Sequence, residues 1–375
     1  METVVLKTHL KEGLEITDRI AAKSPTLPIL SNVLLSAKKE GVRLSATDLQ
    51  IGITYQFLGT TTKEGEVVFL GHPLSSLLAV SLGDRISLKL EGSQLAVAAG
   101  DHRVLLKTLD EEEFPIIPSQ EGSEPSVEVE NSLFCGGLSQ VVGMVGQSQV
   151  RPEISGVLFV FEKKAARVAA TDSFRLAERR FTFEKEGNAE GSFILPAKTA
   201  REIIAVLGER PGKTKIYFSP TQAVFVYDAA ESPARLRIQI VSRLIEGEYP
   251  HYEDIIPSTH KTQVSLAKNE FLNHLKAAGI FAGKTQEVRF RVDPQKKETT
   301  FLSESGETGS HQSTLKGDIS GEPVEVAFNW RFLSEGLAQI HGERVDFGLN
   351  GEDGPALLRP AEQAGYLYVV MPIKA

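Results

Sequence analysis

The sequence predicts an α+β protein made of three tandem repeats, each with two helices and mainly antiparallel sheets. A Thr-Asp pair follows small and apolar residues twice, at Thr47-Asp48 and at Thr171-Asp172, and the two pairs lie about one small domain apart. A Gly-acidic-Arg tripeptide occurs three times at a similar spacing, beginning at Gly83, Gly208 and Gly342. The shared order of these signals indicates that one structural unit is repeated along the chain.

The elements of each repeat follow in the same order. A helical stretch opens each repeat, over residues 9–23, 133–146 and 268–281. A second apolar, helix-like segment precedes each Gly-acidic-Arg tripeptide, over residues 73–82, 197–207 and 330–341, and Gly is a common residue directly after a helix. The residues after each tripeptide alternate between apolar and polar, which predicts strands. Because strands outnumber helices and come in runs, the pattern favours antiparallel sheets.

Two segments rich in Pro, Ser and acidic residues predict the joints between repeats. They cover residues 119–126 and 246–260. We therefore expect domains over residues 1–120, 126–246 and 254–375.

The composition is that of a soluble globular protein without a membrane segment. Of 375 residues, 41% are hydrophobic and 24% are charged, and no apolar run approaches the length of a membrane helix. The single cysteine, Cys135, excludes a disulfide framework and suits the reducing cytoplasm, and the N-terminus does not resemble a signal peptide. The net charge of −8 argues against simple electrostatic binding to nucleic acid, although one basic surface remains compatible with it.

The sequence contains no pattern that predicts catalysis. The eight histidines show no metal-binding spacing, and neither dinucleotide-binding nor P-loop glycine motifs occur. Asp48 and Asp172 could form an acid–base pair, but their equivalent places in two repeats favour a role in capping turns. We therefore expect a protein that is not an enzyme and that has no metal site and no cofactor.

Three stretches together are similar to one known family. They are PTLPILSN at residues 25–32, Thr171-Asp172 followed by Arg175-Leu176-Ala177, and YVVMPI at residues 368–373. In combination they resemble the bacterial sliding clamp, the beta subunit of DNA polymerase III, and the resemblance extends over essentially the whole chain.

The resemblance implies a closed ring of six DNA-clamp domains, formed by a head-to-tail homodimer with helices lining the hole. Such a ring encircles double-stranded DNA without sequence preference and tethers the replicative polymerase, while the clamp loader and other proteins bind through short peptides. A ring that holds DNA by topology needs only a modestly positive lumen, which reconciles it with the acidic net charge. The alternative is a three-repeat scaffold that binds protein partners without encircling DNA.

The resemblance also implies three sets of site residues. A groove for partner peptides is expected from Ile154, Thr171, Phe174, Arg175, Leu176, Pro250, Ile255, Asn329, Phe332, Val369, Met371 and Ile373. DNA-facing residues are expected at Lys7, Lys11, Arg19, Lys23, Gln149, Arg151, Lys198, Arg201, Lys268, Lys276 and Arg331. Contacts across the dimer interface are expected from Val104, Leu106, Ile280 and Phe281. The chain departs from the family pattern at Ser24, where a basic residue is usual, at Ser173-Phe174, where Gly and a smaller or polar residue are usual, and at Phe332, where Tyr is common. Pro152 and Glu153 also differ from the aromatic residues of some relatives.

Overall fold

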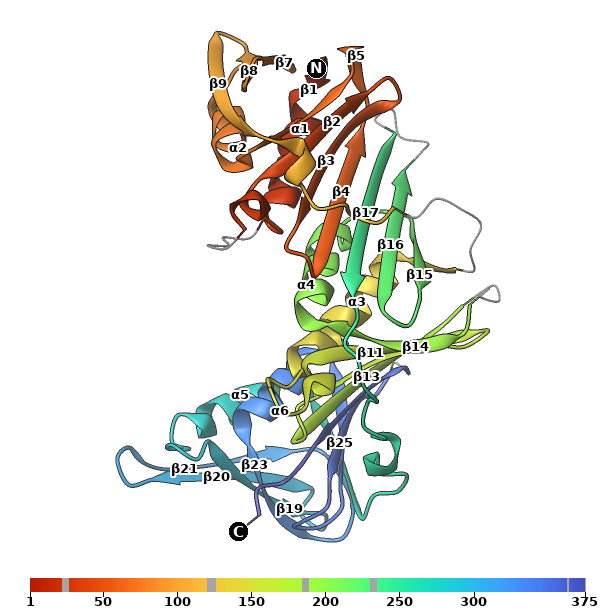
Figure 1. Cartoon of the computed structure of the whole chain (residues 1–375). Coiled ribbons are helices and arrows are strands. Elements are labelled where there is room, and N and C mark those ends of the chain that lie inside the picture. The colour runs from red at the N-terminus through yellow and green to blue at the C-terminus, as the bar shows by residue number, and fades with distance from the viewer. Residues whose placement is uncertain (22–26, 120–125, 184–188, 230–234, 363, 375) are drawn as a thin grey trace. The chain divides into compact units, whose positions relative to one another are not determined.

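The computed structural model describes residues 1–21, 27–119, 126–183, 189–229, 235–362 and 364–374, and the chain forms two compact units (Figure 1). The first unit contains the described residues up to Ser132 and those of Ala205–Leu244. The second contains the described residues of Leu133–Glu186, Glu190–Ile204 and Ile245–Ala375. The three repeat boundaries expected from the sequence remain a prediction.

The described residues form six α-helices, two in each repeat, at the places that the sequence predicts. They are α1 (Lys7–Asp18), α2 (Gly71–Val80), α3 (Asn131–Val141), α4 (Ala197–Leu207), α5 (Lys268–Gly279) and α6 (Trp330–Ala338). The expected bounds of α4 are confirmed. The first helix ends earlier than expected, and Lys23 and Ser24 lie outside the described residues.

The first unit contains a thirteen-stranded sheet in the order β10-β15-β16-β17-β4-β3-β2-β6-β9-β8-β7-β1-β5, and every pairing in it is antiparallel. Its strands are β1 (Glu2–Leu6), β2 (Val33–Lys38), β3 (Gly41–Thr47), β4 (Ile51–Phe57), β5 (Gly59–Lys63), β6 (Gly65–Phe69), β7 (Arg85–Glu91), β8 (Gln94–Ala99), β9 (His102–Leu109), β10 (Val127–Glu130), β15 (Lys213–Phe218), β16 (Gln222–Ala229) and β17 (Leu236–Arg243).

The second unit contains two further antiparallel sheets, in the orders β14-β11-β12-β13-β26-β25-β24-β18-β22 and β21-β20-β19-β23. Their strands are β11 (Gly156–Phe161), β12 (Ala165–Thr171), β13 (Arg175–Thr182), β14 (Gly191–Pro196), β18 (Thr262–Ala267), β19 (Glu287–Asp293), β20 (Glu298–Ser305), β21 (Gly309–Lys316), β22 (Asp318–Gly321), β23 (Val324–Asn329), β24 (Arg344–Leu349), β25 (Ala356–Pro360) and β26 (Tyr366–Val370).

Equivalent strands of successive repeats pair in the same way. The third strand after the opening helix is β4, β13 or β21, and the last strand of a repeat is β9, β17 or β26. In the first unit β4 pairs with β17, and in the second unit β13 pairs with β26. The thirteen-stranded and nine-stranded sheets are therefore each continuous across the boundary between two repeats, and we call such a strand pair a joint.

The Thr-Asp pairs cap tight turns, as the sequence predicts. Oδ1 of Asp172 accepts the backbone N–H groups of Phe174 and Arg175 at 3.0 Å each, and Oδ1 of Asp48 accepts those of Gln50 and Ile51. The residue after each Asp has a positive φ, which this local side-chain bond helps to stabilise. The turn places Arg175 at the start of β13.

The first residue of each opening helix bonds the chain that follows the second helix of its repeat. Nζ of Lys7 donates to the carbonyl oxygen of Ser81 at 2.8 Å, and Nζ of Lys268 donates to that of Ile340 at 2.7 Å. In the middle repeat Nδ2 of Asn131 donates to the carbonyl oxygen of Arg210 at 3.2 Å. A cationic side chain at a helix C-terminus satisfies carbonyl groups that lack a partner within the helix.

Burial raises the pKa of Asp18, at the end of α1, to about 6, while His72 acts in the opposite direction. The carboxylate lies against Gly71, the first residue of α2, where a Cβ would come within 2.3 Å of Oδ1. The folded protein thus binds this proton more tightly than the unfolded chain, whose carboxyl has an ordinary pKa of about 3.9. We expect the free energy of unfolding to fall as the pH rises from about 4 to about 6.

Asp18→Asn should remove this part of the pH dependence and should raise the stability above about pH 6. Urea denaturation at several pH values measures the free energy of unfolding of wild type and variant. Glu15→Gln, on the exposed face of the same helix, is the control. If the free energy of unfolding depends on pH in the same way for wild type and Asp18→Asn, the assignment of this pH dependence to Asp18 is wrong.

Candidate protein-interaction site

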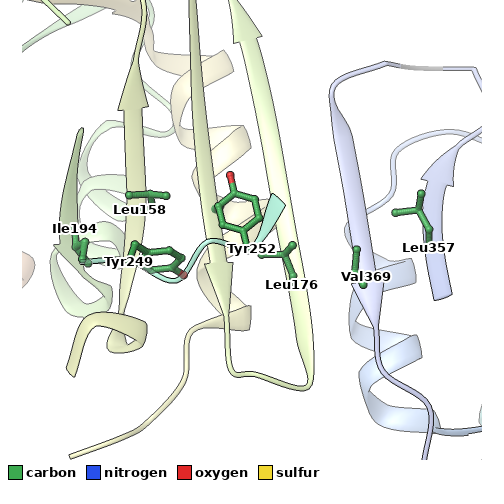
Figure 2. Packing of buried hydrophobic residues seen from close by; sticks show 8 residues of the cluster. Leu158, Leu176, Ile194, Tyr249, Tyr252, Leu357 and Val369 are labelled. Atoms are coloured by element: carbon green, nitrogen blue, oxygen red, sulfur yellow. The ribbon is translucent and has the colours of Figure 1, made fainter. Parts of the chain in front are cut away.

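The predicted peptide-binding residues, which we call the partner site, lie around the joint between β13 and β26 in the second unit. Beneath it is a hydrophobic cluster in which Leu176 of β13 and Val369 of β26 are direct cross-strand partners (Figure 2). Tyr249 and Tyr252, from the segment before the third repeat, pack into the same cluster. Leu176 and Val369 are therefore core residues that support the site rather than a contact surface.

The segment over residues 246–260, which its composition marks as a linker, is anchored by two buried tyrosines. The hydroxyl of Tyr249 accepts the backbone N–H of Thr171 at 3.1 Å. The hydroxyl of Tyr252 donates to Oε2 of the buried Glu178 at 2.6 Å. The backbone on either side of Pro250 is thereby fixed against the end of β12 and against β13.

The exposed Phe174 lies beside the half-buried Phe332 and Arg175 in the partner site. Phe174 is 62% exposed, and its ring lies 6.5 Å from that of Phe332. The guanidinium of Arg175 lies 4.4 Å from the centre of the Phe332 ring. The backbone N–H of Met371 donates to the carbonyl oxygen of Phe174 at 2.8 Å, which brings the C-terminal segment to the same place.

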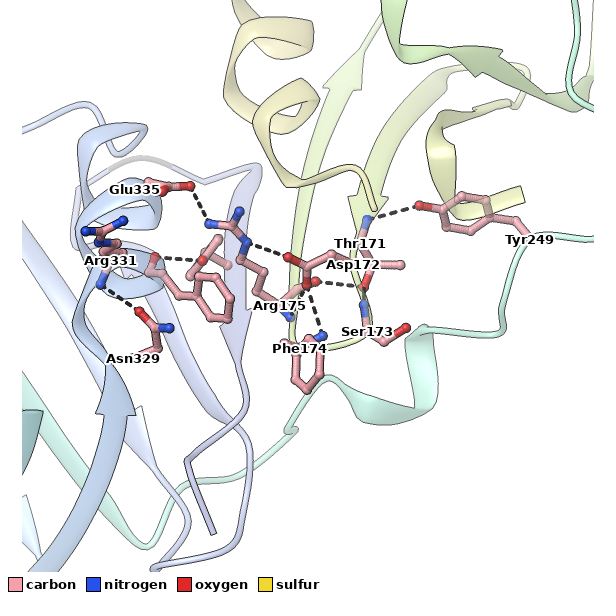
Figure 3. Close-up of polar contacts among 11 residues, drawn as sticks. Thr171, Asp172, Ser173, Phe174, Arg175, Tyr249, Asn329, Arg331 and Glu335 are labelled. Atoms are coloured by element: carbon pink, nitrogen blue, oxygen red, sulfur yellow. Dashed lines mark hydrogen bonds and ion pairs between the residues drawn. The ribbon is translucent and has the colours of Figure 1, made fainter. Parts of the chain in front are cut away.

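Arg175 is held by two carboxylates (Figure 3). Its Nε lies 2.9 Å from Oδ2 of Asp172, and its Nη1 lies 2.5 Å from Oε2 of Glu335 on α6. Burial acts to lower the pKa of the Arg175 guanidinium, but interactions with Tyr368, Glu335 and Asp172 outweigh it and hold that pKa above its ordinary value. Two of the guanidinium donors, on Nε and Nη1, are thus engaged by carboxylates within the chain.

The other predicted members of the partner site differ in exposure. Ile154 and Thr171 are buried, and the backbone N–H of Gly146 is directed at the carbonyl oxygens of both. Ile255 is exposed. Oδ1 of Asn329 accepts the backbone N–H of Arg331 and caps α6, so that oxygen is already used, and the backbone N–H of Ile373 pairs with the carbonyl oxygen of Ala327. The structure brings these residues to one region of the second unit, and their role in binding remains a prediction.

The predicted DNA-facing residues are divided between the two units. Lys11, Arg19, Lys198, Arg201, Lys276 and Arg331 lie on or next to helices with their side chains partly or fully exposed. Lys7 and Lys268 are bonded to carbonyl groups beyond a second helix. Arg151 is exposed and bonds Glu153 and Ser173, near the exposed Gln149. Lys23 is outside the described residues. That the other side chains contact DNA remains a prediction.

The predicted dimer residues lie on or beside strand edges that have no partner strand among the described residues. Val104 and Leu106 are in β9, whose residues 102–107 pair only with β8 among the described residues. Ile280, directly after α5, is 70% exposed, and the ring of Phe281 stacks on His311 of β21 at 5.8 Å. Within the described chain β21 is the edge strand of its sheet.

Comparison with known proteins identifies the family. Three family models match in succession: the N-terminal domain of the DNA polymerase III beta subunit over residues 1–118, its central domain over 128–251 and its C-terminal domain over 253–374. The chain is a beta sliding clamp of DNA polymerase III. It has 24% identity to the beta sliding clamps of Synechococcus elongatus and Bacillus subtilis, and the alignments cover the whole chain and 99% and 100% of those proteins.

Solved clamp structures have the same fold. The beta subunit of Thermotoga maritima superposes with a TM-score of 0.89 at 26% identity, over 100% of this chain and 99% of the other. That of Pseudomonas aeruginosa superposes with a TM-score of 0.92 at 23% identity over the full length of both. The sliding clamp is a non-catalytic polymerase subunit, which agrees with the expectation that the chain is not an enzyme. In the described part of the clamp, no helix is long and apolar enough to cross a membrane, and no group of metal-ligating side chains gathers.

Sequence reasoning did not include Glu335 in the partner site. Glu335 follows Phe332 by three residues on α6, so the two side chains share a helix face. That spacing is the signal that could have identified Glu335, but its ion pair with Arg175 joins two repeats and cannot be read from local sequence.

Phe174→Ala should weaken the binding of partner peptides several-fold, because it removes most of the exposed aromatic surface beside Phe332. Fluorescence anisotropy with a labelled peptide from a polymerase partner measures the change. Leu133→Ala, at an exposed apolar residue of α3, is the control. An unchanged or higher affinity would mean that Phe174 restricts the site instead of forming part of it.

Proposed function

We propose that two copies of this clamp close head to tail into a ring around double-stranded DNA and tether the replicative polymerase to it. The observation that carries the proposal is that the same strand pairing joins successive repeats. Two of the three joints that the repeat pattern defines are formed within the chain, by β4 with β17 and by β13 with β26. In the part of the chain that the structure describes, β21 and residues 102–107 of β9, the strands of the third joint, each have a free edge, and an open edge calls for a partner strand.

The two internal joints suggest a register for the third. In them Ile53 faces Ile240 and Ala177 faces Tyr368. The strand pairings within each repeat give His311 of the third repeat the same place as Ile53 of the first and Ala177 of the second. They give Val104 of the first repeat the same place as Ile240 of the second and Tyr368 of the third. His311 of one protomer would therefore lie opposite Val104 of the other, and Gln312 opposite Arg103.

Exposed apolar residues next to these edges support the same contact. In the second unit Nε2 of Gln140 on α3 donates to the carbonyl oxygen of Gln339, after α6. The equivalent contact of the third joint would place the end of α5, with Ile280, against the end of α2. There Val80 and Leu82 are exposed.

Cysteine cross-linking tests the ring joint. Oxidation of a variant with both Arg103→Cys and Gln312→Cys should give a covalent dimer. The pair Lys107→Cys and Gln312→Cys is the control, since its members are four residues out of register, on the order of 13 Å along the strand. A covalent dimer from the control but not from the first pair would reject the register, and none from either would reject the joint.

DNA would be held by topology, with the basic residues of the helices providing a weak, sequence-independent attraction. Partner peptides, including those of the polymerase and the clamp loader, would bind at the partner site in the cytoplasm. The clamp family and the exposed aromatic surface beside Arg175 support this part of the proposal.

Retention on DNA of defined topology tests encirclement. The protein is loaded onto a nicked circular plasmid with clamp loader and ATP, then passed over a sizing column before and after linearisation. Co-elution with the circle and loss after linearisation are expected. Equal retention on both forms, or none with a loader shown to bind this protein, would favour the alternative of a scaffold that does not encircle DNA.

A further inference from the structure

We propose that Glu335 is a built-in competitor for the Nη1 donor of Arg175, which a partner peptide displaces from that donor and which makes the partner site prefer uncharged peptides to acidic ones. The inference rests on the proposed peptide-binding role of the partner site. It starts from the geometry of Arg175, whose side chain is only 10% exposed and is engaged by carboxylates on two sides.

The two carboxylates are not equivalent. Asp172 is part of the turn, since its Oδ1 accepts two backbone N–H groups while its Oδ2 accepts Nε of Arg175, and its side chain is 18% exposed. Glu335 projects from α6, its side chain is 51% exposed, and the interaction that the structure shows for it is the one with Arg175. Glu335 can therefore rotate into water, whereas moving Asp172 would open the turn.

Arg175 keeps its position when Glu335 leaves. Its guanidinium stays bonded to Asp172 and packed on the Phe332 ring at 4.4 Å. The guanidinium that Glu335 releases lies on the Phe332 ring, and the exposed ring of Phe174 lies 6.5 Å from that ring. A hydrogen-bond acceptor of the peptide thus takes the place of the Glu335 carboxylate, while Arg175 and Phe332 stay in position. An apolar residue of the peptide can lie on the ring of Phe174.

The exchange gives the site a charge preference. After the exchange a bound acceptor lies near the negative charges of Asp172 and the displaced Glu335 and the positive charge of Arg175, while Arg331 lies four residues before Glu335 on α6. Because these charges balance, a peptide carboxylate gains no net attraction there and still loses its hydration, a cost that a peptide carbonyl or amide largely avoids.

The test uses Glu335→Gln, which keeps the size of the side chain and removes its charge. The probes are an acetylated, uncharged pentapeptide amide ending in Leu-Phe and the same peptide with one Asp. The affinity of full-length protein for the uncharged peptide should rise roughly two- to fivefold, the range for a partly exposed ion pair, and that for the acidic peptide should rise more. Added salt should raise the wild-type affinity for the uncharged peptide and change that of Glu335→Gln less.

Glu128→Gln is the matched control, because Glu128 is also a surface glutamate in an ion pair, with Lys213, and belongs to the first unit, which contains no residue of the partner site. It should leave both affinities unchanged. Equal affinities of wild type and Glu335→Gln would overturn the competitor role while the peptide site stands. A lower affinity of Glu335→Gln would mean that the ion pair positions Arg175 for binding, and binding of neither peptide to either protein would overturn the peptide site itself.

Discussion

Replacing Ile280 by aspartate is expected to convert the dimer into a monomer and to abolish retention on circular DNA. Ile280 follows α5 and is 70% exposed in the single chain, next to the open edge of β21. In the proposed ring this side chain is buried against the exposed apolar residues Val80 and Leu82 of the other protomer. An unpaired carboxylate buried there would cost several kcal/mol, and the ring contains two such joints.

Sedimentation velocity measures the assembly state, and the plasmid assay measures retention. Ile116→Asp is a matched control, since Ile116 is even more exposed and lines a pocket with residues of β2, β3, β4 and β17 instead of either open edge. It should remain dimeric and retained. A dimeric Ile280→Asp protein would place the subunit contact elsewhere, and a monomeric Ile116→Asp protein would show that a charge on any exposed apolar residue is sufficient.

Local signals predicted the repeated elements well because they depend on residues close in sequence. The Thr-Asp pairs act within three residues, so the turns at Asp48 and Asp172 could be foreseen. The Gly-acidic-Arg tripeptides were less reliable. Arg85 and Arg344 begin β7 and β24, but in the middle repeat Pro211 and Gly212 are inserted and β15 begins only at Lys213.

The roles of several charged and linker residues depend on contacts that sequence does not reveal. Lys7 and Lys268 have the composition of an exposed helix face, yet each bonds a carbonyl group more than seventy residues away. Tyr249 and Tyr252 lie in a segment whose Pro and acidic residues predict a linker, yet both rings are buried. In each case the partner comes from a distant part of the chain, and only the assembled fold identifies it.

Leu176→Ala is expected to lower the free energy of unfolding by about 2–5 kcal/mol, the usual cost of removing a fully buried leucine side chain. Leu176 is 0% exposed and faces Val369 across the joint between β13 and β26. The cavity would form directly beneath Arg175 and beside the tyrosines that anchor the segment around Pro250. Urea denaturation measures the loss, and Leu133→Ala, a truncation of an exposed leucine in the same unit, should cost less than about 1 kcal/mol.

The same variant separates support of the partner site from contact with a peptide. Because Leu176 has no exposed surface, it cannot touch a ligand unless the site opens. If the joint positions Arg175 and Phe174, then Leu176→Ala should also weaken peptide binding under conditions where the protein remains folded. If stability falls and peptide affinity does not, the exposed residues hold their geometry through the Asp172 turn and the Phe332 ring alone. A stability equal to that of Leu133→Ala would contradict the packing itself, since a truncation in this cluster that costs nothing requires the joint to be open in solution.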